Sequence, residues 1–385
     1  MSNRWKAGFI QAFFDPLTVG PLLPFGPLYM WGTDENGQLG INSQGVAYSS
    51  PVQVGAEANW KVLELGGNSN YVSTSAIKTD GTLWSWGRNQ AGQLGTGNII
   101  ARSSPVQVGA LTNWSKLARG RTSCLAIKTD GTLWAWGDNT AGCLGLSLDP
   151  SGNAKSSPTQ VGSLTTWLTI SLAYSHVAAI KTDGTLWTWG GNGGGKLGHN
   201  DTVYRSSPVQ VGSLTTWADA RVGQIGCAAV RTDGTAWSWG ADFYGQLALN
   251  IPQYSYRSSP VQIGALTNWS KATTTNTCFT AIKTDGTLWT SGYGAQGQTG
   301  QNNTTNVSSP VQVGVGTDWS EFSSKAQNTL LLKTDDTLWG LGLGNGGLHG
   351  NNSTANVSSP VQIGTSSWES ISTSLSRSSG GIESS

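Results

Sequence analysis

Residues 103–145, SSPVQVGALTNWSKLARGRTSCLAIKTDGTLWAWGDNTAGCLG, decide the fold of this 385-residue chain. This stretch contains the signature Leu-Trp-x-Trp-Gly, which occurs seven times along the sequence, in four copies with one substitution. Successive copies begin 55, 50, 53, 50, 52 and 50 residues apart. Because the strand-like pattern keeps its length while the spacing varies, the extra residues must lie in loops. The seven copies occupy residues 28–32, 83–87, 133–137, 186–190, 236–240, 288–292 and 338–342.

Two further segments of each unit predict strands and turns. Lys-Thr-Asp-Gly-Thr, as at residues 128–132, lies between two alternating apolar runs and indicates a hairpin, because Asp and Gly tolerate positive φ. Ser-Ser-Pro-Val-Gln also recurs, and its proline indicates an outer strand or the approach to one, since proline cannot donate a ladder hydrogen bond. A single tryptophan further on opens the next strand. Each unit thus contains three to four short strands, the content of one propeller blade.

The two ends of the chain hold complementary halves of a unit. The last unit passes Trp368 and stops near Ile382, before any signature strand, while the first signature strand, in residues 25–32, has no half unit before it. Pairing the two halves completes a seventh blade and removes the open edges of a linear array. The sequence therefore predicts an all-β, seven-bladed β-propeller over residues 25–385, closed by strands from both ends, with a separate extension over residues 1–24.

Composition agrees with this fold and narrows the functional classes. The chain has 53 Gly, 19 Trp and 11% charged residues, which is typical of a β-rich protein with glycine turns and an aromatic core. A formal net charge of +1 speaks against nucleic-acid binding. The apolar stretch near the N-terminus is interrupted by Asp15 and several prolines, so we expect neither a membrane span nor a signal peptide. The four cysteines are widely spaced, which favours buried free thiols over disulfides or a metal site.

A ten-residue pattern, Trp-Gly-x-Asn-x-x-Gly-Gln-Leu-Gly, connects the chain to a known family. It is seen in residues 86–95, WGRNQAGQLG, and 136–145, WGDNTAGCLG. With these residues the chain resembles the regulator-of-chromosome-condensation repeat family, and its repeats look most like the bacterial and bacteriophage branch. The resemblance implies a seven-bladed propeller. It implies no single function, since the family includes exchange factors for small GTPases, an inhibitor of β-lactamase and many bacterial and viral proteins of unknown role.

Chemical groups that recur in every unit are explained more simply by structure than by catalysis. Eighteen of the 19 tryptophans fall at three repeat positions, which favours packing over carbohydrate binding. The Asp of each hairpin has a turn role, and blade symmetry keeps these carboxylates apart, whereas glycosidase pairs lie within about 10 Å. The glycine run 191–195 occupies a turn slot and lacks the ending of a phosphate loop. His176, His199 and His349 form no recognisable catalytic motif, so we predict no catalytic residues, metal site or cofactor.

Positions that break the repeat are the ones that symmetry does not explain. The longest departures, at residues 146–155, 201–205, 242–244 and 251–257, are predicted to be loops. The last three are rich in Tyr and Arg, which are favoured at binding hot spots because they combine large contact area with polar reach. Tolerated drift of a loop sequence is the alternative. The candidate binding residues are Tyr204, Arg205, Phe243, Tyr244, Tyr254, Tyr256 and Arg257.

The N-terminal segment 1–24 is the other departure. Its stretch RWKAGFIQAFFDPLTVGP resembles leaders of bacteriophage structural proteins. Its large apolar side chains are unfavourable in water beside a complete ring, and its prolines favour an extended segment over a helix. The segment either tucks under the propeller or docks into a larger assembly, and we favour docking. The predicted anchor residues are Trp5, Phe9, Ile10, Phe13 and Phe14.

These features lead to two functional hypotheses. The first is a bacteriophage virion structural protein, made in the host cytoplasm and anchored to other virion proteins by the N-terminal segment. Its propeller would decorate the particle or attach it to a host surface protein or glycan. The alternative is a soluble bacterial protein–protein interaction module in the cytoplasm, acting as an inhibitor or scaffold. An enzyme or exchange factor would need an unrepeated cluster of polar groups on one face, which the sequence does not display.

Overall fold

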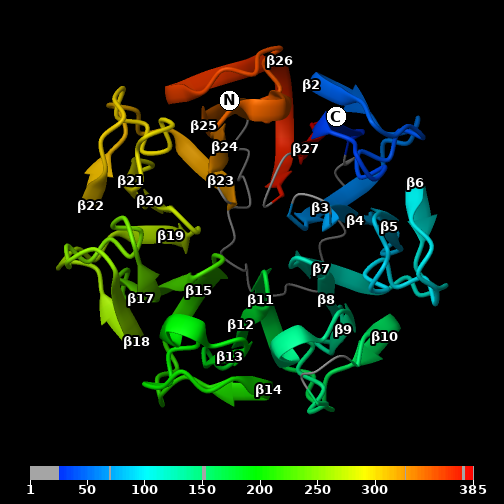
Figure 1. Ribbon diagram of the computed structural model, residues 1–385, viewed down its shortest axis with the longest axis horizontal. Helices are drawn as coiled ribbons and strands as arrows, with labels where there is room; N and C mark the ends of the chain where they lie inside the picture. Colours follow the sequence, from blue (N-terminus) through cyan, green and yellow to red (C-terminus); the bar gives the residue numbers. More distant parts are fainter. Residues whose placement is uncertain (1–25, 69–70, 150–152, 326, 375–377, 385) are drawn as a thin grey trace, which may run out of the picture.

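The computed structural model describes residues 26–68, 71–149, 153–325, 327–374 and 378–384. The strands of these residues form sheets arranged around a central axis (Figure 1). Five sheets have four strands each, and one has seven strands because β26 is shared between two blades. The arrangement amounts to seven four-stranded blades, which confirms the predicted propeller.

Blades 1 to 5 each consist of four consecutive strands, from the axis outward. Blade 1 contains β3 (Trp60–Gly66), β4 (Ser73–Lys78), β5 (Leu83–Gly87) and β6 (Arg102–Gln107). Blade 2 contains β7 (Trp114–Arg119), β8 (Ser123–Lys128), β9 (Leu133–Gly137) and β10 (Lys155–Gln160). Blade 3 contains β11 (Trp167–Ala173), β12 (His176–Lys181), β13 (Leu186–Gly190) and β14 (Arg205–Gln210). Blade 4 contains β15 (Trp217–Val222), β16 (Gly226–Arg231), β17 (Ala236–Asp242) and β18 (Ser255–Gln262), and blade 5 contains β19 (Trp269–Thr274), β20 (Cys278–Lys283), β21 (Leu288–Gly292) and β22 (Val307–Gln312).

Blades 6 and 7 share one long strand. Blade 6 contains β23 (Trp319–Lys325), β24 (Asn328–Lys333), β25 (Thr337–Gly342) and the first part of β26 (Val357–Thr373). Blade 7 contains the second part of β26, then β27 (Ser378–Glu383), β1 (Leu28–Thr33) and β2 (Ala47–Gln53). Short 3-10 helices lie in the turns after β9, β13 and β25: η2 (Thr140–Gly142), η3 (Gly193–Gly195) and η4 (Asn345–Gly347).

The closure of the ring follows the prediction. Strand β1 from the beginning of the chain pairs with β27 from its end, from Leu28 opposite Ile382 to Gly32 opposite Ser378. This antiparallel ladder replaces the covalent connection that joins the strands of the other blades. It therefore leaves no unpaired strand edge between the first and last units.

Tryptophan packing joins neighbouring blades on the side of the Leu-Gly turns. The second Trp of the signature, for example Trp136, is fully buried and donates from Nε1 to the Gln93 carbonyl of the preceding blade at 3.1 Å. Gly95 must be a glycine here, because its φ is +75° and a Cβ would lie 2.7 Å from that Nε1. The packing role predicted for the tryptophans is confirmed. The same bond is made by Trp31, Trp86, Trp189 and Trp239.

The two ends of the ring carry different connections. We call the end with the Lys-Thr-Asp-Gly-Thr hairpins the hairpin face, and the end with the Leu-Gly turns the turn face. In blade 2, Trp114 opposite Lys128 lies toward the hairpin face, and Arg119 opposite Cys124 lies toward the turn face. In blade 7, Leu28 opposite Ile382 and Trp368 opposite Glu383 lie toward the hairpin face. Residues 26 and 384, the ends of the described chain, therefore lie on the hairpin face.

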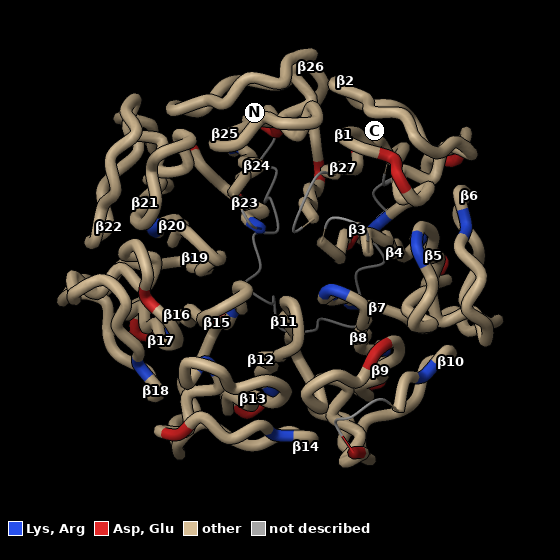
Figure 2. Tube along the Cα trace, in the orientation of Figure 1, with Lys and Arg blue, Asp and Glu red and all other residues tan. Residues whose placement is uncertain are grey.

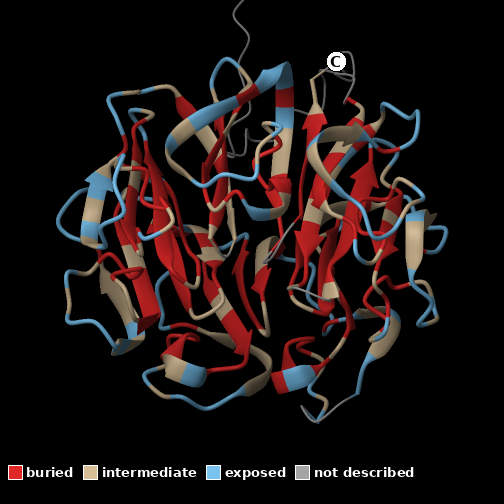
Figure 3. Ribbon diagram, turned by 45° about the horizontal axis from the view of Figure 1, so that its top comes forward, coloured by how far each residue is buried: buried red, intermediate tan, exposed pale blue. Residues whose placement is uncertain are grey.

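The distribution of charged residues fits a chain with 11% charged residues and a net charge of +1. Lys, Arg, Asp and Glu are scattered over the blades in both signs (Figure 2). Buried residues lie mainly on the inner strands, while exposed residues lie in the loops and on the outer strands (Figure 3). The four cysteines are buried free thiols, as predicted. Among the described residues, no helix has the length and apolar character needed to cross a membrane.

Candidate functional site

An aromatic cluster lies on the turn face of blade 4. Strand β17 runs two residues past Gly240, so that Ala241 pairs with Tyr256 and Asp242 with Ser255. This longer outer pair holds the Phe243 ring 5.9 Å from the Tyr254 ring and 6.1 Å from the Tyr256 ring, measured between centroids. Phe243 thereby contacts two other predicted binding residues.

The neighbouring loop of blade 3 lies against this cluster. The amide of Asn200 donates to the Ser258 carbonyl of β18 at 2.6 Å, and the Tyr256 ring lies beside Gly194 of blade 3. Tyr204 follows in that loop and is 55% exposed. We define the rim cluster as the three packed rings of blade 4, Phe243, Tyr254 and Tyr256, together with the exposed Tyr204 of the adjacent blade 3 loop.

The rim cluster presents large apolar side chains to solvent. Tyr254 is 67% exposed and Tyr256 is 53% exposed. Tyr254 also has a φ of +62°, a left-handed conformation that disfavours a bulky residue. Backbone strain of this kind persists where the surrounding structure enforces it, and it gathers at binding and active sites. The rim cluster thus combines exposure with strain.

The two predicted arginines are already engaged. Arg205 donates to Asp201 at 2.7 Å and to the Val203 carbonyl at 2.7 Å, which stiffens the loop that carries Tyr204. The hydrogen bond from Arg205 lowers the pKa of Asp201, so this carboxylate is charged at neutral pH. Arg257 donates to the carbonyl of Tyr256. Both guanidinium groups lie at the edge of the rim cluster as positively charged neighbours.

Tyr244 packs against blade 5. Its ring centroid lies 4.9 Å from that of Tyr293, and its backbone amide donates to Gln246 Oε1 at 2.7 Å. Tyr293 was missed by sequence reasoning. The sequence signal was an aromatic residue directly after the signature of blade 5, at the position where blades 1 and 2 carry the charged residues Arg88 and Asp138.

The predicted loop boundaries need correction. Arg205 begins β14, and Tyr256 and Arg257 belong to β18, so these three residues are strand residues rather than loop residues. Asp242 likewise ends β17. The reason is that the extra residues of blade 4 continue the alternating pattern of its outer strands, and aromatic side chains favour extended backbone. The extra residues of blade 4 therefore lengthen the strand pair β17–β18 instead of the loop between these strands.

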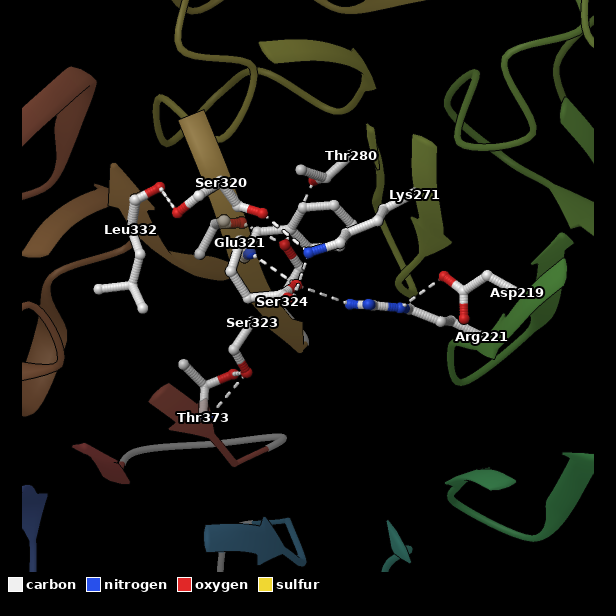
Figure 4. A network of polar contacts seen from close by, with 12 residues as sticks. Asp219, Arg221, Lys271, Thr280, Ser320, Glu321, Ser323, Ser324, Leu332 and Thr373 are labelled. Atoms are coloured by element: carbon white, nitrogen blue, oxygen red, sulfur yellow. Dashed lines mark hydrogen bonds and ion pairs between the residues drawn. The ribbon is translucent and has the colours of Figure 1, made fainter. Parts of the chain in front are cut away.

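Sequence reasoning also missed a group of charged side chains on the innermost strands of blades 4, 5 and 6 (Figure 4). Arg221 on β15 donates to Asp219 at 3.0 Å and to Glu321 on β23 at 3.2 Å. Lys271 on β19 reaches the same Glu321 at 2.6 Å. We call these four residues the axial network. The sequence does contain a signal for this network. The second residue after the opening Trp is charged in these three blades, but it is uncharged in others, for example Val62 in blade 1.

The axial network holds strands together and offers no free charge for a ligand. Its two positive and two negative groups bind one another, and their side chains are between 11% and 27% exposed. Burial acts to raise the pKa of Glu321, but the charges of Arg221 and Lys271 outweigh it, and this pKa lies below its ordinary value. The carboxylate is therefore ionised at neutral pH, and it links three blades near the axis.

Three of the potential catalytic groups are in unsuitable surroundings. His176 is fully buried, and burial together with the nearby charge of Lys196 lowers the pKa of His176 well below its ordinary value. Burial raises the pKa of the Cys124 thiol to about 11 and that of the Cys143 thiol to about 12. A neutral buried imidazole and protonated buried thiols do not fit proton transfer or nucleophilic attack on a substrate. In the part of the chain that is described, no three His, Cys, Asp or Glu residues gather as metal ligands.

The hairpin turns have the local role that was predicted. In blade 2, Asp130 accepts hydrogen bonds from the backbone and hydroxyl of Thr132, and Trp134 Nε1 donates to the same hydroxyl. Lys128 Nζ lies 3.6 Å from the Trp134 ring centroid. These contacts stay within one hairpin and account for the recurring Lys-Thr-Asp-Gly-Thr motif.

Comparison with known proteins agrees with the repeat and the geometry. The model of the regulator of chromosome condensation (RCC1) repeat matches residues 80–127, 130–180 and 183–230. The chain contains RCC1 repeats in these three segments. The RCC1-repeat structure of yeast Prp20p, described together with its binding properties to Gsp1p and histones, superposes with a TM-score of 0.80 at 17% identity, covering 94% of this chain and 92% of that one. Human WBSCR16 superposes with a TM-score of 0.81 at 16% identity, covering 93% of this chain and 100% of that one.

Curated relatives of the RCC1 repeats match over shorter lengths. The human probable E3 ubiquitin-protein ligase HERC6 is 30% identical over 182 residues, which is 46% of this chain and 18% of the ligase. The ultraviolet-B receptor UVR8 of Arabidopsis thaliana is 36% identical over 83 residues, which is 22% of this chain and 18% of the receptor. The matches thus span less than a fifth of the length of these relatives. They share repeats with the chain, and the activities of the whole relatives do not follow from them.

The predicted anchor residues, Trp5, Phe9, Ile10, Phe13 and Phe14, lie outside the described residues. What the fold establishes is the point at which the segment joins the propeller. Gly26 lies on the hairpin face next to the C-terminal strand, where a Cβ would lie 1.6 Å from the Glu383 carbonyl oxygen. The rim cluster lies on the opposite, turn face.

Proposed function

We propose that this RCC1-repeat propeller is a binding module for a protein partner and that the rim cluster is its contact surface. The observation that carries the proposal is the cluster of exposed aromatic side chains on blades 3 and 4, one of them held at a positive φ. Exposed aromatic groups of this size cost stability unless a partner covers them.

The composition of the rim cluster fits a protein interface. Tyrosine and arginine are enriched at interface hot spots because a ring buries a large area at little entropic cost, while its hydroxyl still finds a partner. Arg257 and the Asp201–Arg205 ion pair at the edge supply the polar rim that surrounds such an apolar centre. The RCC1-repeat protein Prp20p, whose reported binding properties concern Gsp1p and histones, supports the use of this fold for protein recognition.

The test is capture of a partner by matched variants of the full-length protein. The first variant carries Tyr204→Ala, Tyr254→Ala and Tyr256→Ala. The control carries Val46→Ala, Ile99→Ala and Ile100→Ala, which are exposed by 48%, 64% and 55% on the turn face of other blades. A protein retained from host-cell extract by wild type and control, but lost by the first variant, is then purified and its Kd measured by calorimetry. Equal retention and equal Kd for all three proteins would refute the role of the rim cluster.

A narrower proposal is display on a bacteriophage particle, with residues 1–24 as the anchor of a propeller that begins at residue 25. Its support is the resemblance of the N-terminal segment to bacteriophage leaders, together with the position of Gly26 on the hairpin face. A propeller attached through that face would direct the rim cluster away from the particle. A host surface protein would then be its partner.

Mass spectrometry of purified particles tests this narrower proposal. A fixed copy number of the chain per particle is expected, with antibody labels against the turn face visible on intact particles by electron microscopy. Absence from the particles would leave the soluble interaction module in the bacterial cytoplasm as the function to pursue.

A further inference from the structure

The hairpin face carries a row of exposed apolar side chains on consecutive connections between blades. Each connection leads from the outer strand of one blade to the opening Trp of the next, and five of the seven present a large apolar side chain to solvent. The four leucines are between 42% and 47% exposed, and the valine is 93% exposed. We call the five residues the apolar arc: Leu111, Leu164, Leu214, Leu266 and Val315.

The apolar arc is interrupted at the blade where the N-terminal segment joins the ring. The connection into blade 1 carries Glu57, which pairs with Lys78 at 2.5 Å, and the connection into blade 7 carries Thr365 and Ser366. Both flank blade 7, to which β1 belongs. The connections into blades 2 to 6 therefore carry a large apolar residue. The two connections that flank blade 7, where Gly26 joins the ring, do not.

The chain outside the described propeller has the length to reach the apolar arc. Twenty-five residues precede Gly26. An extended chain spans at most about 3.3 to 3.6 Å per residue, or about 80 to 90 Å for this segment. A domain of about 360 residues has a radius of gyration of about 21 Å, so every member of the arc is within reach.

The segment also has the chemistry to cover this face. Its apolar side chains include Trp5, Phe9, Phe13 and Leu17, and it carries Arg4 and Lys6 at its basic end. A Lys or Arg precedes each hairpin Asp by two residues, so the hairpin face carries both charges and its apolar groups decide the contact. Hydrogen bonds from the Thr hydroxyl and amide two residues later lower the pKa values of the six hairpin Asp residues, so the carboxylates are ionised. These residues are Asp80, Asp130, Asp183, Asp233, Asp285 and Asp335.

From these observations we infer that residues 1–24 fold back across the hairpin face of their own propeller and cover the apolar arc. Attachment at Gly26 gives the segment a high effective concentration at this face, which favours its own propeller over a second copy. Contact with the arc removes apolar groups of both partners from water. The inference does not depend on the rim cluster, because that cluster lies on the opposite face. Residues 1–24 must then dissociate from the apolar arc before they can anchor the propeller to a particle.

Site-specific photo-cross-linking of the full-length protein tests this contact. Phe9 or Phe13 is replaced by p-benzoylphenylalanine, the protein is irradiated, and the cross-linked peptides are identified by mass spectrometry. We expect cross-links to the peptides that contain Leu164 and Leu214. In a mixture of light and 15N-labelled protein, these cross-links join residues of one chain and not of two.

A pair of matched variants shows whether the arc is the docking surface. Leu164→Ser together with Leu214→Ser is expected to abolish most of the cross-linking, since both leucines are partly exposed and their loss leaves the core intact. Ile99→Ser with Ile100→Ser, on the turn face, is expected to change nothing. The inference is overturned by cross-links that join two chains, by cross-links to the turn face, by their absence, or by equal yields in the two variants.

Discussion

The two faces of the propeller use the same residue type, tryptophan, in opposite ways. On the turn face, the second signature Trp donates across the blade boundary, as Trp136 does to the Gln93 carbonyl. On the hairpin face, the first signature Trp donates within its own hairpin, as Trp134 does to Thr132. On the turn face a Trp side chain therefore joins neighbouring blades. On the hairpin face the Trp side chain stays within its blade, and the blades are joined by a backbone bond, such as that from the Trp167 amide to the Gly131 carbonyl of the preceding blade at 3.2 Å.

This difference explains where the chain tolerates change. The hairpin is repeated with little variation, because its turn glycine also lies against the connection into the next blade: a Cβ on Gly131 would lie 2.1 Å from the Thr165 carbonyl oxygen. The turn face has long connections between the third and fourth strands of each blade, and their outer parts are not fixed by the Trp bond. The rim cluster arises there, where blade 4 extends a strand pair beyond Gly240.

The largest effect is expected from a turn-face bond at the closing blade. Trp31 is fully buried, donates to the Leu348 carbonyl of blade 6 at 2.9 Å, and packs edge-on against Trp368 at 5.8 Å. Trp31→Ala removes this packing where no covalent link joins the strands, and should destabilise the protein by about 3 to 5 kcal/mol. Urea denaturation measures the free energy of unfolding. An unchanged midpoint would contradict the role of Trp31 in closure.

A smaller effect, dependent on pH, is expected in the axial network. Glu321 has a pKa below its ordinary value in the folded state, so its contribution to stability is present above about pH 4.5 and is lost as the pH falls through the folded value. Glu321→Gln should cost about 1 to 2 kcal/mol at pH 7, since the side chain is partly screened by solvent. Thermal unfolding from pH 7 to pH 3 checks this. The difference between wild type and variant should shrink in acid, and a constant difference would assign the effect to packing.

Much of the fold could be predicted from the sequence, because the repeat encodes it locally. The Asp-Gly hairpin, the outer proline strand and the complementary half units each have a direct physical reason, and all three are confirmed. The axial network could not be predicted in the same way. Arg221 and Glu321 are 100 positions apart, and their contact depends on how three blades converge at the axis.

The candidate site was predictable only in part. Breaks in the repeat identified Phe243, Tyr254 and Tyr256, which the structure brings together. They did not reveal that the break lengthens a strand pair, or that Tyr244 turns toward Tyr293 of the next blade. Strand extension and cross-blade contacts depend on neighbouring blades, whose positions a one-dimensional repeat does not specify.

A third, smaller effect is expected in the hairpins. Asp130→Ala removes the two hydrogen bonds from Thr132, and should destabilise the protein by about 0.5 to 1 kcal/mol because the turn is open to solvent. Hydrogen exchange gives the sharper readout. Faster exchange should be confined to residues 123–137 of blade 2 and to the Trp167 amide, which donates to the Gly131 carbonyl, whereas Trp136→Ala should also increase exchange in blade 1. If faster exchange spread equally into neighbouring blades in both variants, the proposed difference between the two faces would be wrong.

The smallest expected change in stability tests whether the strained backbone of Tyr254 serves partner binding. Tyr254 and Asp336 both have a positive φ, of +62° and +66°, and Asp336 stands where blade 2 has Gly131. Glycine adopts this conformation without steric cost, so Tyr254→Gly and Asp336→Gly should each raise the free energy of unfolding by up to about 1 kcal/mol. For Tyr254 the loss of its contact with Phe243 offsets part of the gain. Urea midpoints measure the stabilities, and Kd for the captured partner measures binding. If the strain at Tyr254 serves recognition, only its replacement should weaken binding; unchanged binding in both variants would make the conformation of Tyr254 a tolerated irregularity.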